Sequence, residues 1–90
     1  MDILGKIYRI ERIDQLIRMK ATGTPVQLAK RLETSERTIY DIIKLMKKIG
    51  APIYYCRYRK SYCYRKDVNF SFGFTLIKNE TYKLKTGRRF

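Results

Sequence analysis

The stretch that decides the fold is TPVQLAKRLETSERTIYDIIKLMKKIGAPI, residues 24–53. It holds two helix beginnings, because Thr24 stands before Pro25 and Ser35 stands before a run of regularly spaced apolar residues. Thr and Ser are favoured N-cap residues, since their side-chain oxygen accepts a hydrogen bond from a free helical N–H, and proline suits the first helical position. The pattern predicts a short helix from Pro25 to about Leu32, a tight connection, and a longer helix that begins after Ser35.

The longer helix carries one clear apolar stripe. Ile39, Ile43 and Met46 recur at i, i+4 and i+7, so they lie on one side of the helix and are predicted to be buried. The helix is expected to end at Gly50, with Pro52 preventing its continuation.

A second apolar stripe, made of Ile42, Leu45 and Ile49, lies beside the first. A helix with one face in water does not need it. Three interpretations are open: these side chains pack on an enlarged core, on the aromatic C-terminal segment, or on a partner subunit.

Another helix is predicted before this stretch. Its apolar residues recur at three- and four-residue steps, and Ala21-Thr22-Gly23 ends the pattern. Gly5 weakens its beginning, so fraying is expected over residues 1–5. The apolar positions are Ile3, Ile7, Ile10, Ile13, Leu16 and Ile17.

After Pro52 the pattern changes to strands. Residues 53–58 and 62–64 are rich in Tyr, a strong strand former, and Arg59-Lys60-Ser61 separates them, which predicts a β-hairpin with a basic tip. In residues 67–77, Phe and Val alternate with small or polar residues, so a further strand is expected there, packed on the core or at a dimer interface. Residues 78–90 are expected to form a basic, mobile tail.

Charge is the dominant global feature, because 21 Lys and Arg against 8 Asp and Glu give a net charge of +13. Such a surplus favours a polyanionic partner, with nucleic acid first and an anionic membrane surface second. No apolar run is long enough to span a membrane and no secretory signal is recognisable, so a cytoplasmic protein is expected.

Catalytic and metal chemistry find little support in the sequence. The chain has no His and only two Cys, so a four-ligand zinc site is excluded and the usual general base is absent. We therefore expect a protein that is not an enzyme and uses no cofactor or metal, and no small-molecule ligand can be inferred.

The predicted order of helix, short helix, tight turn, helix and hairpin is that of a winged helix-turn-helix, an α+β fold spanning residues 1–66. A helix fits the DNA major groove and presents polar side chains to base edges from its N-terminal end, while a basic hairpin can follow phosphates as a wing. The candidate DNA-contacting residues are Ser35, Arg37, Thr38, Tyr40 and Lys44 in the helix and Arg57, Arg59 and Lys60 in the hairpin.

Three motifs carry a resemblance to a known family: T-P with L-A and L in residues 24–32, S-E-R-T-I-Y in residues 35–40, and G-A-P-I in residues 50–53. Together they resemble the N-terminal DNA-binding domain of DeoR-type and WYL-type bacterial transcription regulators, over roughly residues 10–64. The resemblance implies that the helix over residues 35–49 is the recognition helix and the hairpin is the wing. The expected function is sequence-specific binding of double-stranded DNA in transcription regulation.

Two departures from that family stand out. Asp41-Ile42 replaces the Arg-Asp that often follows the Tyr, which removes a phosphate contact and adds a repelling charge. The wing tip has Lys60-Ser61 where Gly-Gly is common, so its turn geometry is expected to differ.

Two other functions are weighed against DNA reading. Asp41, Ile42 and the Phe-rich segment suit a winged-helix protein-interaction module that binds nucleic acid only non-specifically. The tyrosines of the hairpin suit a stacking platform for RNA or single-stranded DNA, although alternate tyrosines in a hairpin more often pack on helices.

A homodimer is expected, because the Phe-rich strand is too apolar for a monomer surface and two-fold dimers read two half-sites. If the hairpin is symmetric about Arg59-Lys60, Cys56 and Cys63 lie opposite each other. A disulfide there would be strained, so free thiols are favoured over a redox switch.

Overall fold

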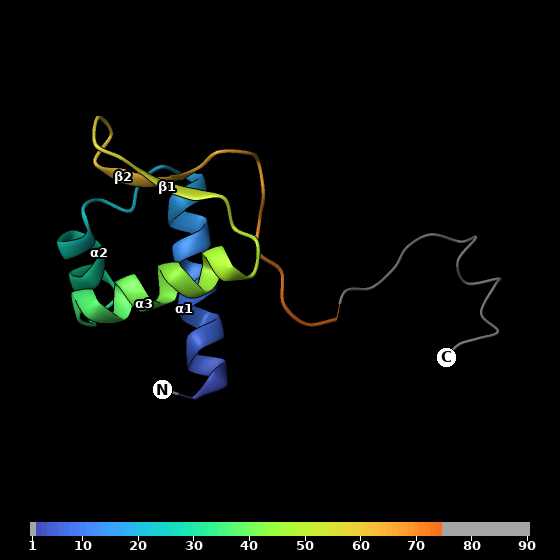
Figure 1. Ribbon diagram of the computed structural model, residues 1–90. Helices are drawn as coiled ribbons and strands as arrows, with labels where there is room; N and C mark the ends of the chain where they lie inside the picture. Colours follow the sequence, from blue (N-terminus) through green and yellow to red (C-terminus); the bar gives the residue numbers. More distant parts are fainter. Residues whose placement is uncertain (1, 75–90) are drawn as a thin grey trace, which may run out of the picture.

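The computed structural model describes residues 2–74, which form three helices followed by a two-stranded antiparallel hairpin (Figure 1). The elements are α1 (Ile3–Arg18), α2 (Pro25–Arg31), α3 (Glu36–Lys48), β1 (Ile53–Cys56) and β2 (Ser61–Tyr64). This is the predicted α+β winged-helix arrangement. The hairpin lies beside the C-terminal end of α1, and the beginning of α1 projects past the rest of the body (Figure 1). Among residues 2–74, no helix combines the length and apolarity needed to cross a membrane.

The two helix beginnings predicted within residues 24–53 are confirmed. Thr24 Oγ1 accepts a hydrogen bond from the Gln27 N–H at 3.2 Å, and Gln27 Oε1 accepts one from the Thr24 N–H at 2.8 Å. This reciprocal capping box satisfies two backbone donors at the start of α2. Ser35 caps α3, because its Oγ accepts from the Thr38 N–H at 3.1 Å.

Helix α1 begins at Ile3 in spite of Gly5. The carboxylate of Asp2 accepts a hydrogen bond from the Gly5 N–H at 2.8 Å, so an N-cap holds the turn that was expected to fray. The helix ends at Arg18, and Lys20 then turns the chain with a positive φ of 55°.

One core joins all three helices to the hairpin. Ile42 is 5% exposed and belongs to it, so the first interpretation of the second stripe on α3, an enlarged core, holds for this residue. Leu45 is partly buried and packs against the core, whereas Ile49 is 59% exposed. The buried cluster consists of Ile10, Ile13, Leu16, Ile17, Leu28, Ala29, Ile39, Ile42, Ile43, Met46, Ile53 and Tyr62.

Buried polar groups fasten the hairpin to the α1–α2 connection. Thr22 is fully buried, its Oγ1 accepts from the Tyr62 N–H at 2.8 Å, and its own N–H donates to Ser61 Oγ at 3.2 Å. The connection therefore runs along the outer edge of β2. Because buried polar groups must find partners, these bonds fix where the hairpin sits.

A second polar link joins β2 to α1. The Tyr64 hydroxyl donates to Asp14 Oδ1 at 2.7 Å, and Arg18 Nε donates to Asp14 Oδ2 at 3.2 Å. Asp14 is 1% exposed, so its carboxylate depends on these two partners.

The expected pairing of the two cysteines is wrong. Cys56 lies opposite Ser61 and Cys63 lies opposite Tyr54, and both thiols are free. Strand β1 ends two residues earlier than predicted and β2 begins one residue earlier, so the turn covers residues 57–60, with Lys60 at a positive φ of 53°. The turn is centred one residue earlier than predicted. This shifts the pairing of the two strands by two residues, so the cysteines do not lie opposite each other.

The predicted C-terminal strand is not formed over residues 67–74. After the Arg65 N–H donates to the Pro52 carbonyl at 2.9 Å, the chain leaves the hairpin, so no strand neighbour remains for it (Figure 1). Phe70 packs against the core, as expected for part of this segment, while Phe72 and Phe74 are exposed. The remainder of the predicted strand and the basic tail lie outside the described residues.

The Tyr64→Phe substitution tests the Tyr64–Asp14 link. Burial, the hydrogen bond to Asp14 and its charge raise the pKa of Tyr64 above its ordinary value near 10. The unfolded chain therefore ionises first, and the stability contributed by Tyr64 is lost as pH rises above about 10. We expect Tyr64→Phe to lower the free energy of unfolding by about 1–3 kcal/mol at neutral pH. Between about pH 9 and 11, the free energy of unfolding of the variant should fall less steeply than that of the wild type.

Urea unfolding at several pH values measures both effects. Tyr58→Phe is the matched control, because the Tyr58 side chain is fully exposed at the hairpin tip. Equal behaviour of the two variants would contradict a stabilising role for the link.

Candidate nucleic-acid interface

The outer face of α3 carries the predicted base-reading residues. Arg37, Tyr40 and Lys44 are exposed and follow one another at three- and four-residue steps, which places them along one side of the helix. The opposite side is fixed in the core by Ile39 and Ile43. The helix is thus held rigidly while its polar side chains face solvent, which is the arrangement that groove reading needs.

The two hydroxyls at the start of α3 are bonded to each other. Ser35 Oγ and Thr38 Oγ1 lie 3.0 Å apart, and Ser35 Oγ also accepts from the Thr38 N–H. Only one of the two hydroxyl hydrogens is used between them, so the other stays available to an acceptor on DNA. Ser35 therefore has a capping role first, and Thr38 is partly buried.

Arg37 has an acidic neighbour one turn along α3. Its Nε lies 4.0 Å from Asp41 Oδ2, and the two side chains are 88% and 68% exposed. An exposed pair at this distance stabilises the helix little. Asp41 nevertheless biases where the guanidinium rests, and it leaves the other donors of Arg37 free to form a bidentate contact.

The hairpin tip presents the predicted wing cations. Arg57, Arg59 and Lys60 are all exposed, and Tyr58 between them is 96% exposed. The turn therefore offers three positive charges to a phosphate backbone.

Most of the hairpin tyrosines pack within the structure. Tyr62 is buried and meets Tyr55 edge-on, with ring centroids 5.1 Å apart. Tyr64 binds Asp14, and the Arg65 guanidinium covers the Tyr54 ring at 4.7 Å. A continuous platform for stacking single-stranded bases is therefore not formed by residues 53–64.

The structure brings further cations to the wing that the sequence analysis did not single out. Lys20 and Arg31 line a groove together with Arg59 and Lys60. About 40 residues separate Lys20 from Lys60 in sequence, and the groove exists only because the α1–α2 connection runs along β2. No local sequence signal points to it.

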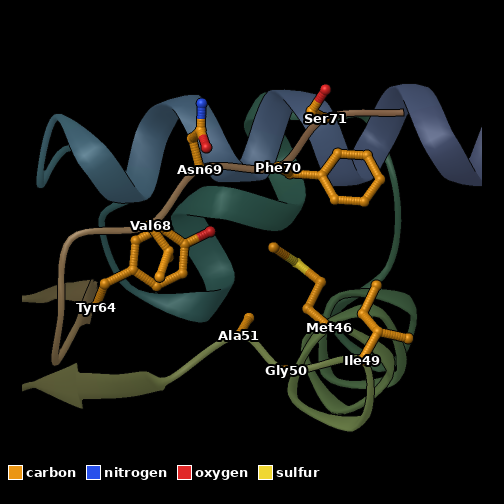
Figure 2. A pocket seen from close by; sticks show the side chains of 9 residues that line it. All are labelled: Met46, Ile49, Gly50, Ala51, Tyr64, Val68, Asn69, Phe70 and Ser71. Carbon is orange, nitrogen blue, oxygen red and sulfur yellow. The ribbon is translucent and has the colours of Figure 1, made fainter. Parts of the chain in front are cut away.

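A second, more apolar groove of about 350 Å³ lies at the end of α3. Figure 2 shows Met46 and Ile49 on one side of it and Val68 and Phe70 on the other. No group of His, Cys, Asp or Glu suited to holding a metal ion occurs in the described part of the chain.

Three helices with a hairpin, and a rigidly held third helix with a polar outer face, define a winged helix-turn-helix protein. Comparison with known families agrees: the family described as "HTH domain" matches residues 9–59. This is more than half of the chain, and the protein belongs to this family of helix-turn-helix DNA-binding domains. No curated protein and no solved structure matches the chain significantly.

Substitutions at Ser35 test its capping role. Ser35→Ala removes the acceptor of the Thr38 N–H, so we expect the free energy of unfolding to fall by about 1 kcal/mol. Ser35→Asn keeps a good cap and is expected to keep nearly wild-type stability. Thermal or urea unfolding measures both variants, and an equally stable Ala variant would show that the cap contributes little.

Proposed function

We propose that this protein is a sequence-specific transcription regulator that binds double-stranded DNA with α3 in the major groove. The observation that carries the proposal is the exposed row Arg37, Tyr40 and Lys44 on a helix whose other side is locked in the core. Membership in the helix-turn-helix family supports it. The nearer resemblance to DeoR-type and WYL-type regulators stays a prediction.

Arg37 is the residue we assign to guanine. A guanidinium forms two parallel hydrogen bonds to the O6 and N7 atoms of guanine, and such a pair contributes about 1–3 kcal/mol of discrimination. Ser35, Thr38 and Tyr40 are assigned to neighbouring base edges or to the sugar-phosphate backbone. Lys44 is assigned to phosphate, since it lies two turns along the same exposed side.

Asp41 restricts what α3 can read. A carboxylate only accepts hydrogen bonds and is repelled by phosphates, so in the major groove it favours the amino group of cytosine. Asp41 lies one turn from Arg37. We propose that the two side chains together favour a step containing guanine and cytosine.

The wing supplies affinity that does not depend on sequence. Arg57, Arg59 and Lys60 are assigned to backbone phosphates, where each contact releases condensed counterions. Binding should therefore weaken steeply as salt rises.

The rival function, a protein-interaction module without groove reading, has less support than the sequence indicated. It requires Ile42 at the surface, and Ile42 is 5% exposed within the core. Asp41 is its remaining support on α3, and an acidic residue is also compatible with reading cytosine.

Enrichment from random duplex DNA at physiological salt tests the proposed function. We expect a defined motif with the wild-type protein and a weakened or relaxed motif with Arg37→Ala, because one bidentate contact is lost. Lys6→Ala is the matched control, since it removes one exposed charge at the projecting start of α1. Binding without any motif, equal in all three proteins, would overturn base reading by α3.

We also propose that the protein acts as a homodimer. Phe72 and Ile49 are 60% and 59% exposed, and Ile49 lines the apolar groove of Figure 2. An apolar side chain and an apolar groove on one chain can be buried reciprocally by a second copy around a two-fold axis. Such a dimer would place two α3 helices on two half-sites.

Analytical ultracentrifugation with and without the enriched duplex tests the dimer. The net charge of +13 makes two free copies repel each other, so we expect dimers mainly on DNA. Phe72→Ser should lower the fraction of dimer, while Tyr58→Ser, an exposed aromatic at the hairpin tip, should not. A wild-type protein that stays monomeric at high concentration in both conditions would refute it.

A further inference from the structure

We infer that the groove between the α1–α2 connection, α2 and the hairpin tip holds one phosphate of the DNA backbone, shared between the helices and the wing. We call it the basic groove, and it is lined by Lys20, Ala21, Gly23, Gln27, Arg31, Arg59 and Lys60. The inference rests on the proposed function and adds a binding site and two cations, Lys20 and Arg31, to it.

The chemistry of the lining selects an anion. Four of the seven lining residues are Lys or Arg, and no carboxylate is among them. The volume is about 410 Å³ and the groove is open to solvent, which suits a phosphate that remains attached to a larger molecule. Gln27 adds neutral donors, because its Oε1 is used by the Thr24 N–H while its amide N–H groups have no hydrogen-bond partner among residues 2–74.

The walls of the basic groove are held in place before any ligand binds. Arg31 Nη1 donates to the Ala21 carbonyl at 2.9 Å, which anchors the guanidinium across the groove and leaves its other N–H donors free. Thr22 joins the connection to β2 through Ser61 and Tyr62. The two sides therefore do not need to be ordered by the ligand, and preorganised donors bind more tightly.

Backbone strain singles out two of the lysines. Lys20 and Lys60 have φ values of 55° and 53°, and they are two of the three non-glycine residues with positive φ among residues 2–74. Gly and Asn adopt this conformation at lower cost than Lys. Both positions therefore accept Asn without strain, and the two lysine side chains line one groove.

A shared phosphate distinguishes this arrangement from separate wing and helix contacts. If Lys20 and Lys60 bind the same phosphate, removing either one weakens a single contact, and removing both weakens that same contact, which Arg31 and Arg59 still line. If they bind different phosphates, their losses multiply. The two cases predict different salt dependences, because the slope of log affinity against log salt changes by about one for each phosphate contact.

The test is a double-mutant cycle with Lys20→Asn and Lys60→Asn, measured by fluorescence anisotropy on a duplex over a range of salt concentrations. Asn tolerates positive φ, so all variants should fold at least as stably as the wild type. We expect each single variant to bind several-fold more weakly. The double variant should lower the salt slope by at most about one rather than by about two. The enriched motif should not change.

Lys30→Gln is the matched control, since Lys30 is exposed on α2 beside Arg31 but does not line the groove. We expect less than a twofold effect from it. If Lys20→Asn behaves like Lys30→Gln, or if the losses multiply and the slope falls by about two, the shared phosphate is overturned.

The outcomes separate this inference from the proposed function. If Arg37→Ala relaxes the motif while Lys20→Asn has no effect, base reading stands and the basic groove falls. If the cycle shows the shared contact but no motif is ever enriched, the groove stands and base reading falls. Titration with inorganic tripolyphosphate adds a third arm: saturable binding lost in Lys20→Asn, with duplex affinity unchanged, would assign the groove to a free phosphate ligand instead.

Discussion

The hydroxyl of Thr22 is the constraint on which the position of the wing depends. A hairpin of two four-residue strands is not stable alone, so it must be held by the helices. Thr22 does this by accepting the N–H of Tyr62 from the edge of β2, inside a region that excludes water. The Tyr64–Asp14 bond then fixes the end of the same strand to α1. Replacing both bonds by water would require opening the core, so the wing stays in one place relative to the helices.

The local parts of the fold could be predicted because they depend on neighbouring residues. Thr24 and Ser35 cap helices through bonds that reach only three residues along the chain, and the apolar stripe of α3 follows from helical periodicity. The register of the hairpin could not be predicted, because the pattern of tyrosines fits a turn at either of two positions that differ by one residue. Ser61, which lies opposite Cys56, accepts a hydrogen bond from the N–H of Thr22, and no local pattern predicts a contact between residues so far apart in the chain. The alternation in residues 67–74 resembles a strand, but a strand also needs a neighbour to bond with.

The candidate site likewise has one part that could be predicted from the sequence and one part that could not. The row along α3 was predictable, because its residues belong to one helix and the caps and stripe orient it. The grouping of the wing cations with Lys20 and Arg31 was not predictable. Lys20 and Lys60 come together only because of the path that the chain takes between α1 and α2. Their positive φ values are likewise invisible in sequence, because lysine is not a residue that marks such positions. The tyrosines of the hairpin show the reverse case: a pattern that suits base stacking is used for packing instead.

Burial of Ile42 beside Ile43 leaves α3 with an outward face made of charged residues and Tyr40. The exposed row of Arg37, Tyr40 and Lys44, which we propose contacts DNA, does not belong to the core. The residues that hold the fold are therefore different from the residues that we propose select the DNA target. Under the proposed function, descendants of this chain can acquire a new binding sequence through one or two substitutions at exposed positions such as Arg37 and Asp41 without losing stability. On the same proposal, selection can change which genes such a protein regulates while its hydrophobic interior stays nearly unchanged.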